Sequence, residues 1–200
     1  MISLLSSALF NHPTVRLVGA TVTLRPLVMR DWAGWAGLRG LSRNFLKPWE
    51  PAWPADALSR AAFARRLRRQ DNEWRNDLGY SFLTHESRSG TLVGGLNLGI
   101  IRRGVSQSAT IGYWVGEPFT RRGFTTEAVR LALDYAFGEL KLHRVDASCL
   151  PDNQASSNLL QKLGFSYEGR ARGYLRINTI WQDHLLYAIL KEDRRQQDQQ

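Results

Sequence analysis

The chain has 200 residues, 43% of them hydrophobic, and carries a formal net charge of +9 at neutral pH. That length and apolar content suffice for one fairly large domain, whereas no apolar run reaches the roughly 20 residues of a membrane-spanning helix, so we expect no membrane association. The single cysteine, Cys149, excludes an intrachain disulfide and favours a reducing, cytoplasmic setting. The four histidines are scattered along the chain, so we expect no metal site.

The positive charge favours an anionic partner such as a polyphosphate ligand, RNA or a ribosomal surface. The charge alone does not distinguish between them. Part of it lies in the paired arginines of residues 65–69, which we interpret as the solvated face of a helix.

Residues 1–18 show no periodicity and are expected to form an N-terminal extension. Their apolar start has no preceding Lys or Arg and no small-residue cleavage pattern, which argues against a signal peptide. The next part of the chain alternates strand and helix patterns, with Asp31 and Ser59 as expected helix N-caps. The expected elements are strands 20–26, 78–85 and 91–101, helices 32–38 and 59–74, and a stiff aromatic loop at 44–51.

The second half begins with a strand at 109–115, followed by a helix with an apolar stripe of i, i+3, i+4 spacing. A strand at 143–150, a helix capped by Asp152 or Asn153, and strands at 165–174 and 181–190 follow. Without an internal repeat or linker, residues 19–190 are predicted to form one α/β domain with a mixed sheet. The polar residues 191–200 are expected to be a disordered tail.

Residues 109–137 have the layout of an anion-binding site. A strand leads into a basic glycine loop, Arg121-Arg122-Gly123, which opens directly into the helix. Backbone N–H groups at such a helix start are unpaired, and the helix dipole adds about half a positive charge there. Two arginines beside them suit a ligand with several phosphates.

This loop resembles the coenzyme A pyrophosphate loop of the general control N-acetyltransferase (GNAT) superfamily, Q/R-x-x-G-x-G/A. Gly123 matches its central glycine, while Thr120 and Thr125 depart from the usual residues. The resemblance implies acetyl-CoA as the acetyl donor, with no metal. It also implies a GNAT-type mixed, mostly antiparallel sheet of about seven strands flanked by helices, in which strands 109–115 and 143–150 splay apart to hold coenzyme A. The implied cofactor-binding residues of this region are Trp114, Val115, Arg121, Arg122, Gly123, Phe124, Thr125 and Thr126.

A second signature, DNQASSNLLQKLGF, resembles the N-x-x-S/A-x-x-L-Y-x-K-x-G-F helix of the same superfamily. It adds Asn153 and Ser156 to the implied cofactor-binding residues. Leu160 stands where many members carry the tyrosine that protonates the thiolate, so that route is closed here. In the ribosomal-protein acetyltransferase branch the serine is thought to replace it, which points to Ser156 as catalytic; capping of the helix is the alternative role for Asn153 and Ser156.

A third segment, NFLKPWEP at 44–51, resembles the bacterial ribosomal-protein (S5) alanine N-acetyltransferase branch, where it shapes the acceptor site. The resemblance points to Trp49 and Glu50 as substrate-binding residues, with Glu50 also a candidate catalytic base. A packed tryptophan beside a surface glutamate is the alternative. Tyr113 is a further substrate-binding candidate, although Tyr113 or Trp114 should pack on the sheet, because successive residues face opposite sides.

The general base stays open among Glu50, Asp183, His184 and a water chain, because the position that holds a glutamate in related enzymes is Leu175 here. We therefore expect an N-acetyltransferase acting by direct attack in a ternary complex on a protein N-terminus, with a ribosomal protein as the acceptor. Two alternatives remain. One is a GNAT enzyme that acetylates a small amine such as an antibiotic, polyamine or amino acid, and the other is a non-catalytic basic module that binds RNA or the ribosome.

Overall fold

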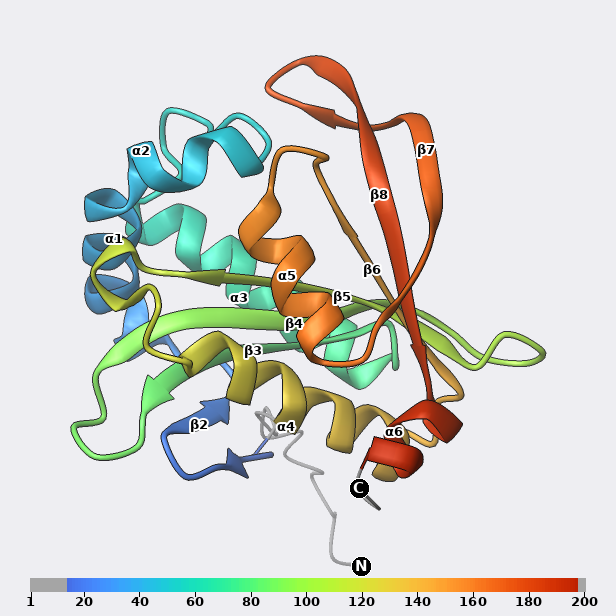
Figure 1. Cartoon of the computed structure of the whole chain (residues 1–200). Coiled ribbons are helices and arrows are strands. Elements are labelled where there is room, and N and C mark those ends of the chain that lie inside the picture. Colours follow the sequence, from blue (N-terminus) through green and yellow to red (C-terminus); the bar gives the residue numbers. More distant parts are fainter. Residues whose placement is uncertain (1–13, 198–200) are drawn as a thin grey trace, which may run out of the picture.

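A computed structural model describes residues 14–197 of the chain, which form one eight-stranded sheet with helices on both faces (Figure 1). The strand order is β1-β2-β3-β4-β5-β6-β8-β7, and every neighbouring pair is antiparallel except β5 and β6. The strands are β1 Leu17–Val18, β2 Val22–Arg25, β3 Gly79–Glu86, β4 Leu92–Arg102, β5 Ser108–Val115, β6 Arg144–Cys149, β7 Ser166–Ile177 and β8 Ile180–Leu190. The helices are α1 Trp32–Leu41, α2 Arg43–Leu46, α3 Arg60–Arg75, α4 Phe124–Gly138, α5 Gln154–Lys162 and α6 Lys191–Gln197, with short 3-10 turns η1 Met29–Asp31, η2 Lys47–Trp49 and η3 Glu117–Phe119.

The sheet has one strand more than the seven expected. The added strand is β1, whose Leu17 and Val18 pair with Leu24 and Thr23 of β2. These two residues belong to the segment expected to be an N-terminal extension, and residues 1–13 of that segment lie outside the described part.

Successive residues of β3 face opposite sides of the sheet, which separates two layers of helices. Phe82 packs in the core beneath α4, whereas Leu83 packs with Trp35 of α1 and Phe63 of α3 on the other side. The predicted stripe of α4 is confirmed: all five of its members, Val129, Ala132, Leu133, Ala136 and Phe137, are buried.

Strands β5 and β6 run parallel and pair only at their beginnings, from Ser108 opposite Arg144 to Thr110 opposite Asp146. Beyond Thr110 the two strands share no further ladder, and the β6-β8-β7 part of the sheet rises away from β5 with α5 beside it (Figure 1). The predicted splay of strands 109–115 and 143–150 is therefore present.

Two segments differ from their sequence-based descriptions. The 44–51 segment is mainly helical rather than a loop, since α2 runs directly into η2, where Pro48 occupies an early position that needs no N–H donor. In place of a disordered tail, Lys191–Gln197 form α6. The Asp193 carboxylate accepts a hydrogen bond from the Leu190 N–H, and Arg194 pairs with Asp134 of α4 at 3.0 Å, which anchors this helix.

None of the helices between residues 14 and 197 is long and apolar enough to cross a membrane.

Candidate active site

The loop before α4 has the backbone form of an anion site. Arg121 and Gly123 both have a left-handed backbone, with φ of 60° and 80°. Gly123 is the N-cap of α4, and no side chain caps the helix, so the first-turn N–H groups point outward. A Cβ at Gly123 would meet no atom within 4 Å, so the space beside this residue is open. The loop can therefore receive a phosphate group.

The two loop arginines differ in their surroundings. The Arg122 guanidinium lies 3.1 Å from the Glu86 carboxylate and 4.8 Å from the centre of the Phe124 ring. The exposed Arg121 has no ion pair within the described part of the chain. Phe124 itself is buried, so only its backbone can serve a ligand. Arg121 is thus the freer of the two cations to bind an incoming phosphate.

Glu127 in the first turn of α4 holds the turn between β1 and β2. Its carboxylate accepts a hydrogen bond from the Thr21 N–H at 2.9 Å and a second from the Thr21 hydroxyl. The contact is so close that a Cβ at Gly19 would lie 2.4 Å from the carboxylate. Glu127 therefore joins the sheet edge to α4 and is not free for chemistry.

A small cleft connects the loop to β5. Four predicted cofactor-binding residues line the cleft: Trp114, Val115, Phe124 and Thr125. Gly94 of β4 and Tyr113 of β5 line it as well. Trp114 also lines a cavity under α3, and its ring lies 4.8 Å from the Arg39 guanidinium carbon.

Tyr113 and Ser156 meet across the splayed strands. Their hydroxyl oxygens lie 2.7 Å apart, and burial raises the pKa of Tyr113, so its hydroxyl keeps its proton. Burial also raises the pKa of the Cys149 thiol, and a hydrogen bond with Ser156 partly offsets that effect. Ser156 therefore joins a tyrosine of β5 to the end of β6. The sequence marked Tyr113 only as a substrate contact, because this pairing joins residues far apart in the chain.

The capping alternative applies to Asn153 and not to the Ser156 side chain. The Asn153 side-chain oxygen accepts a hydrogen bond from the Ser156 N–H at 3.0 Å, so Asn153 is the N-cap of α5. The Ser156 hydroxyl is left for Tyr113 and for the Cys149 thiol. Leu160, at the position of the missing tyrosine, is fully buried in the core.

Glu50 lies in a cluster of aromatic and basic side chains. Arg39 of α1 contacts both of its carboxylate oxygens, at 2.7 and 2.5 Å, and the Trp53 indole N–H donates to it at 2.8 Å. The Arg39 guanidinium carbon also lies 4.3 Å from the Trp53 ring centre. Both carboxylate oxygens are thus engaged, which leaves Glu50 poorly placed to take a proton. Its role as base stays a prediction, as does substrate contact by the half-buried Trp49 at the end of η2.

The other two base candidates stabilise the β7–β8 hairpin. Asp183 accepts hydrogen bonds from the Gly173 N–H at 2.8 Å and from Arg170 at 2.9 Å, and together they lower the pKa of its carboxyl group. His184 is buried, with Nδ1 3.0 Å from the carbonyl oxygen of Gln182. Leu175 is exposed on β7 and carries no titratable group.

In the described residues, no group of His, Cys, Asp and Glu side chains is arranged to hold a metal ion.

Comparisons with known proteins agree with this geometry. A family model described as an acetyltransferase (GNAT) domain matches residues 21–166. A probable N-acetyltransferase, YjcK of Bacillus subtilis, is 37% identical over 180 residues, covering 90% of this chain and 99% of that protein. The [ribosomal protein uS5]-alanine N-acetyltransferase of Escherichia coli is 30% identical over 183 residues, covering 92% of this chain and 94% of that protein. Among solved structures, Mycobacterium smegmatis RimJ in complex with CoA-disulfide superposes with a TM-score of 0.82 at 35% identity, covering 86% of this chain and 83% of that one.

Proposed function

Because the chain belongs to the GNAT acetyltransferase family and is an N-acetyltransferase related to ribosomal-protein acetyltransferases, we propose that it acetylates the N-terminal α-amine of a protein, with a ribosomal protein as its acceptor. The observation that carries the acceptor class is the similarity, over nearly the whole chain, to an enzyme named for ribosomal protein uS5.

Acetyl-CoA supplies the activated acetyl group, as a thioester. The residues of the α4 loop fit its pyrophosphate, since the first-turn N–H groups are uncapped, the space beside Gly123 is open, and Arg121 is free of ion pairs within the described part of the chain. We assign binding of the pantetheine arm to the edge of β5 at Trp114 and Val115 that faces β6, because β6 has separated there while β4 still pairs with the other edge.

Tyr113 and Ser156 serve the departing sulfur. We assign protonation of the thiolate to this hydroxyl pair, because Tyr113 stays protonated and the two oxygens are 2.7 Å apart at the splay. Ser156 passes its hydroxyl proton to the sulfur as Tyr113 passes its own proton to Ser156, and the proton released by the attacking amine returns to Tyr113 through water, so that no tyrosinate remains. This replaces the role that the buried Leu160 cannot perform.

The amine attacks directly, without an acetylated enzyme. Cys149, the only thiol, is buried, and its raised pKa keeps it protonated and therefore a poor nucleophile. An α-amine titrates near pH 8, so a water molecule is enough to take its proton. Glu50 then acts as a positioning residue that holds Arg39 against the rings of Trp53 and Trp114.

The decisive experiment incubates the protein with acetyl-CoA and non-acetylated ribosomal proteins and identifies which intact mass rises by one acetyl group. Acetylation at the N-terminus of one ribosomal protein is the expected result. Acetylation of polyamines, amino acids or antibiotics, with every protein left unchanged, would instead support the small-amine alternative. A third outcome concerns the non-catalytic alternative: CoA fails to raise the Tm, while RNA binds with a steep salt dependence.

A further inference from the structure

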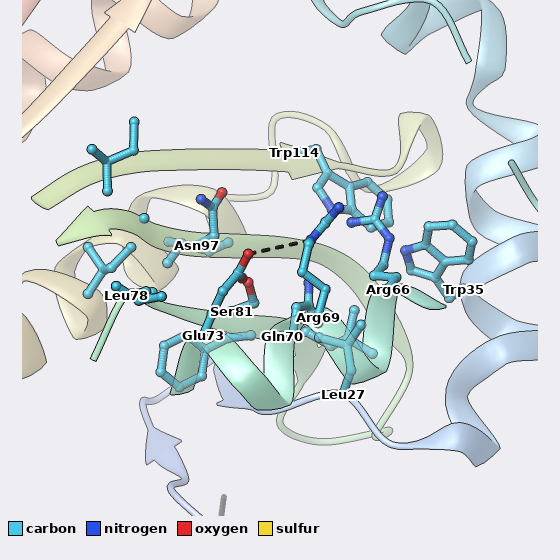
Figure 2. A pocket seen from close by; sticks show the side chains of 17 residues that line it. Leu27, Trp35, Arg66, Arg69, Gln70, Glu73, Leu78, Ser81, Asn97 and Trp114 are labelled. Atoms are coloured by element: carbon cyan, nitrogen blue, oxygen red, sulfur yellow. Dashed lines mark ion pairs between the residues drawn. The ribbon is translucent and has the colours of Figure 1, made fainter. Parts of the chain in front are cut away.

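A cavity of about 360 Å³ lies between α3 and the sheet, outside the proposed cofactor site (Figure 2). Its floor is formed by β3, β4 and β5, where Gly79 and Gly99 pair across the two first strands. Asn97 lies flat on this floor: a Cβ at Gly99 or at Gly112 would come within 3.1 or 2.8 Å of its amide group. Gly99 and Gly112 thus make room for the Asn97 side chain to lie close to the sheet beneath the helix.

The wall of the cavity contains a buried polar atom without a partner. Gln70 of α3 is 7% exposed, and its side-chain carbonyl oxygen accepts no hydrogen bond. Leaving such an oxygen unpaired costs about 1–3 kcal/mol, so a buried group of this kind calls for an explanation. An N–H donor from a bound ligand would provide it once the Gln70 side chain turns its closed-off oxygen into the cavity that this residue lines.

Arg66, one turn earlier on α3, provides a positive charge in the same cavity. Within residues 14–197 no carboxylate forms an ion pair with its guanidinium group, which lies 5.2 Å from the Trp35 ring centre. Burial lowers the pKa of Arg66, and the neighbouring cations Arg69 and Arg39 add to this effect. Two carboxylates, those of Glu50 and Glu73, act on Arg66 in the opposite direction. Neither pairs with it, since Glu50 pairs with Arg39 at 2.5 Å and Glu73 faces Arg69 at 3.4 Å, the second pair being drawn in Figure 2. A half-buried cation whose nearby carboxylates pair with other arginines favours an anionic ligand.

The cavity lies beside the strand that carries the proposed reaction centre. Trp114 lines both this cavity and the small cofactor cleft. Asn97 pairs with Gly112, the residue directly before Tyr113. A ligand resting on the floor of the cavity is therefore close to the splay while approaching from the face opposite α4.

We propose that this cavity binds a carboxylate side chain near the N-terminus of the acceptor, with Arg66 pairing with the carboxylate and Gln70 accepting a hydrogen bond from the acceptor's backbone N–H. The inference rests on the proposed function and narrows its substrate class to acceptors with an acidic residue close to the amine. A peptide supplies an anion for Arg66 and an N–H donor for the Gln70 oxygen.

The test uses five-residue peptides of alanine and serine that carry one Glu, Gln or Lys at position two, three, four or five. Their N-acetylated forms are titrated calorimetrically into the protein saturated with CoA, so that binding is measured without turnover. At one of the four positions, the Glu peptide should bind at least about tenfold more tightly than the Gln peptide, because Gln cannot form the hydrogen-bonded charge pair with Arg66. The Lys peptide should bind least tightly.

Arg66→Gln should abolish the preference for Glu. Arg68→Gln is the matched control, because it removes the same charge from an exposed position of α3. Gln70→Met is a second test if Arg66→Gln does not fold. It should weaken binding of every peptide by about fivefold or more, because the acceptor for the peptide N–H is lost. It should not lower the Tm, because the oxygen that it removes is buried and unpaired in the free protein.

Equal affinity for Glu and Gln at all four positions overturns the inference, and so does a preference for Glu that survives Arg66→Gln. The unblocked peptides, assayed with acetyl-CoA, separate this inference from the proposed function. Acetylation of the peptides without a preference for Glu would refute the proposed acceptor pocket and support the proposed function. Binding that depends on Glu and Arg66, with no acetylation of any peptide or protein N-terminus, would refute the proposed function and support the pocket.

Discussion

Replacing Gly123 with alanine tests whether the start of α4 binds the pyrophosphate of coenzyme A. The left-handed backbone at this residue, with φ of 80°, costs a residue with a Cβ about 1–2 kcal/mol. Reduced flexibility of the unfolded chain returns about 0.4–1 kcal/mol of this. The added Cβ meets no protein atom within 4 Å, so no steric clash adds to the cost. The net loss of about 1 kcal/mol should lower the Tm by about 2–4 °C in a domain of this size.

Gly123→Ala should weaken the binding of coenzyme A by more free energy than it costs in stability. The new Cβ would occupy the open space beside this residue, where a phosphate would approach within hydrogen-bonding distance. Loss of one charge-assisted hydrogen bond, about 1.5–3 kcal/mol, weakens binding by roughly 10- to 150-fold.

Gly90 provides the matched control, since it has φ of 69° and likewise no atom within 4 Å of an added Cβ, but lies in the turn between β3 and β4. Gly90→Ala should lower the Tm as much as Gly123→Ala while leaving the Kd for CoA unchanged, both measured by calorimetry. Equal CoA affinity of Gly123→Ala and the wild type would refute the assignment of the pyrophosphate to this loop.

Three further predictions concern catalysis and stability. Ser156→Ala and Tyr113→Phe should each lower kcat at least about tenfold while keeping the Kd for CoA within twofold, in steady-state and binding assays; an unchanged kcat in both would remove the pair from the mechanism. Burial, with repulsion by Arg25, lowers the pKa of His85 to about 4, so the unfolded chain binds more protons between pH 4 and about 6.5. The contribution of His85 to the free energy of unfolding should be complete above pH 6.5 and fall towards pH 4 by at most about 3 kcal/mol, a figure that solvent screening reduces. Urea titrations of His85→Gln should show a free energy of unfolding that depends less on pH. Leu133→Ala, at a site 1% exposed, should cost about 2–5 kcal/mol in the same titrations, and a loss below 1 kcal/mol would contradict its place in the core.

The elements that sequence predicted well are those with local causes. The apolar stripe of α4 follows from a repeat of 3.6 residues, and Ser59 caps α3 by accepting from the Ala62 N–H three residues away. The backbone of Gly123 is likewise dictated within a few residues. Such features need no knowledge of the remaining fold, so the strand, loop and helix that carry the proposed cofactor site could be predicted.

The acceptor side depends on contacts between distant elements, and there the predictions were weaker. Glu50 was expected to face solvent or an ammonium group, but α1 brings Arg39 against both of its oxygens. An arginine in an amphipathic helix is usually solvated, so the local sequence does not indicate that tertiary packing buries Arg39.

The burial of an arginine in α3 was also missed from the sequence, although the pattern of apolar residues in this helix contained a signal for it. Arg66 was taken as part of a solvated face, whereas it is half-buried and lines the cavity. The apolar positions Phe63, Leu67 and Trp74 leave a gap in their helical stripe, and Arg66 and Gln70 lie on that same face at spacings of three and four residues from Phe63 and Trp74. A polar pair interrupting the buried face of a helix is therefore informative in itself.

These differences have a common physical origin, which bears on the specificity of the reaction. The donor of an acetyl group is always the same molecule, so its site can be built from backbone groups and a short loop. An acceptor must be distinguished by its side chains. The polar groups that we propose for this task, Arg66 and Gln70, must be held away from water to discriminate strongly. Holding them there requires a second layer of helices packed over a glycine-lined sheet, and the unpaired Gln70 oxygen is a cost that the free protein carries until an acceptor binds. If the cavity selects the acceptor, specificity in this chain resides in α3 and not in the α4 loop, and exchanging α3 side chains should change which amine is acetylated while leaving affinity for CoA unaltered.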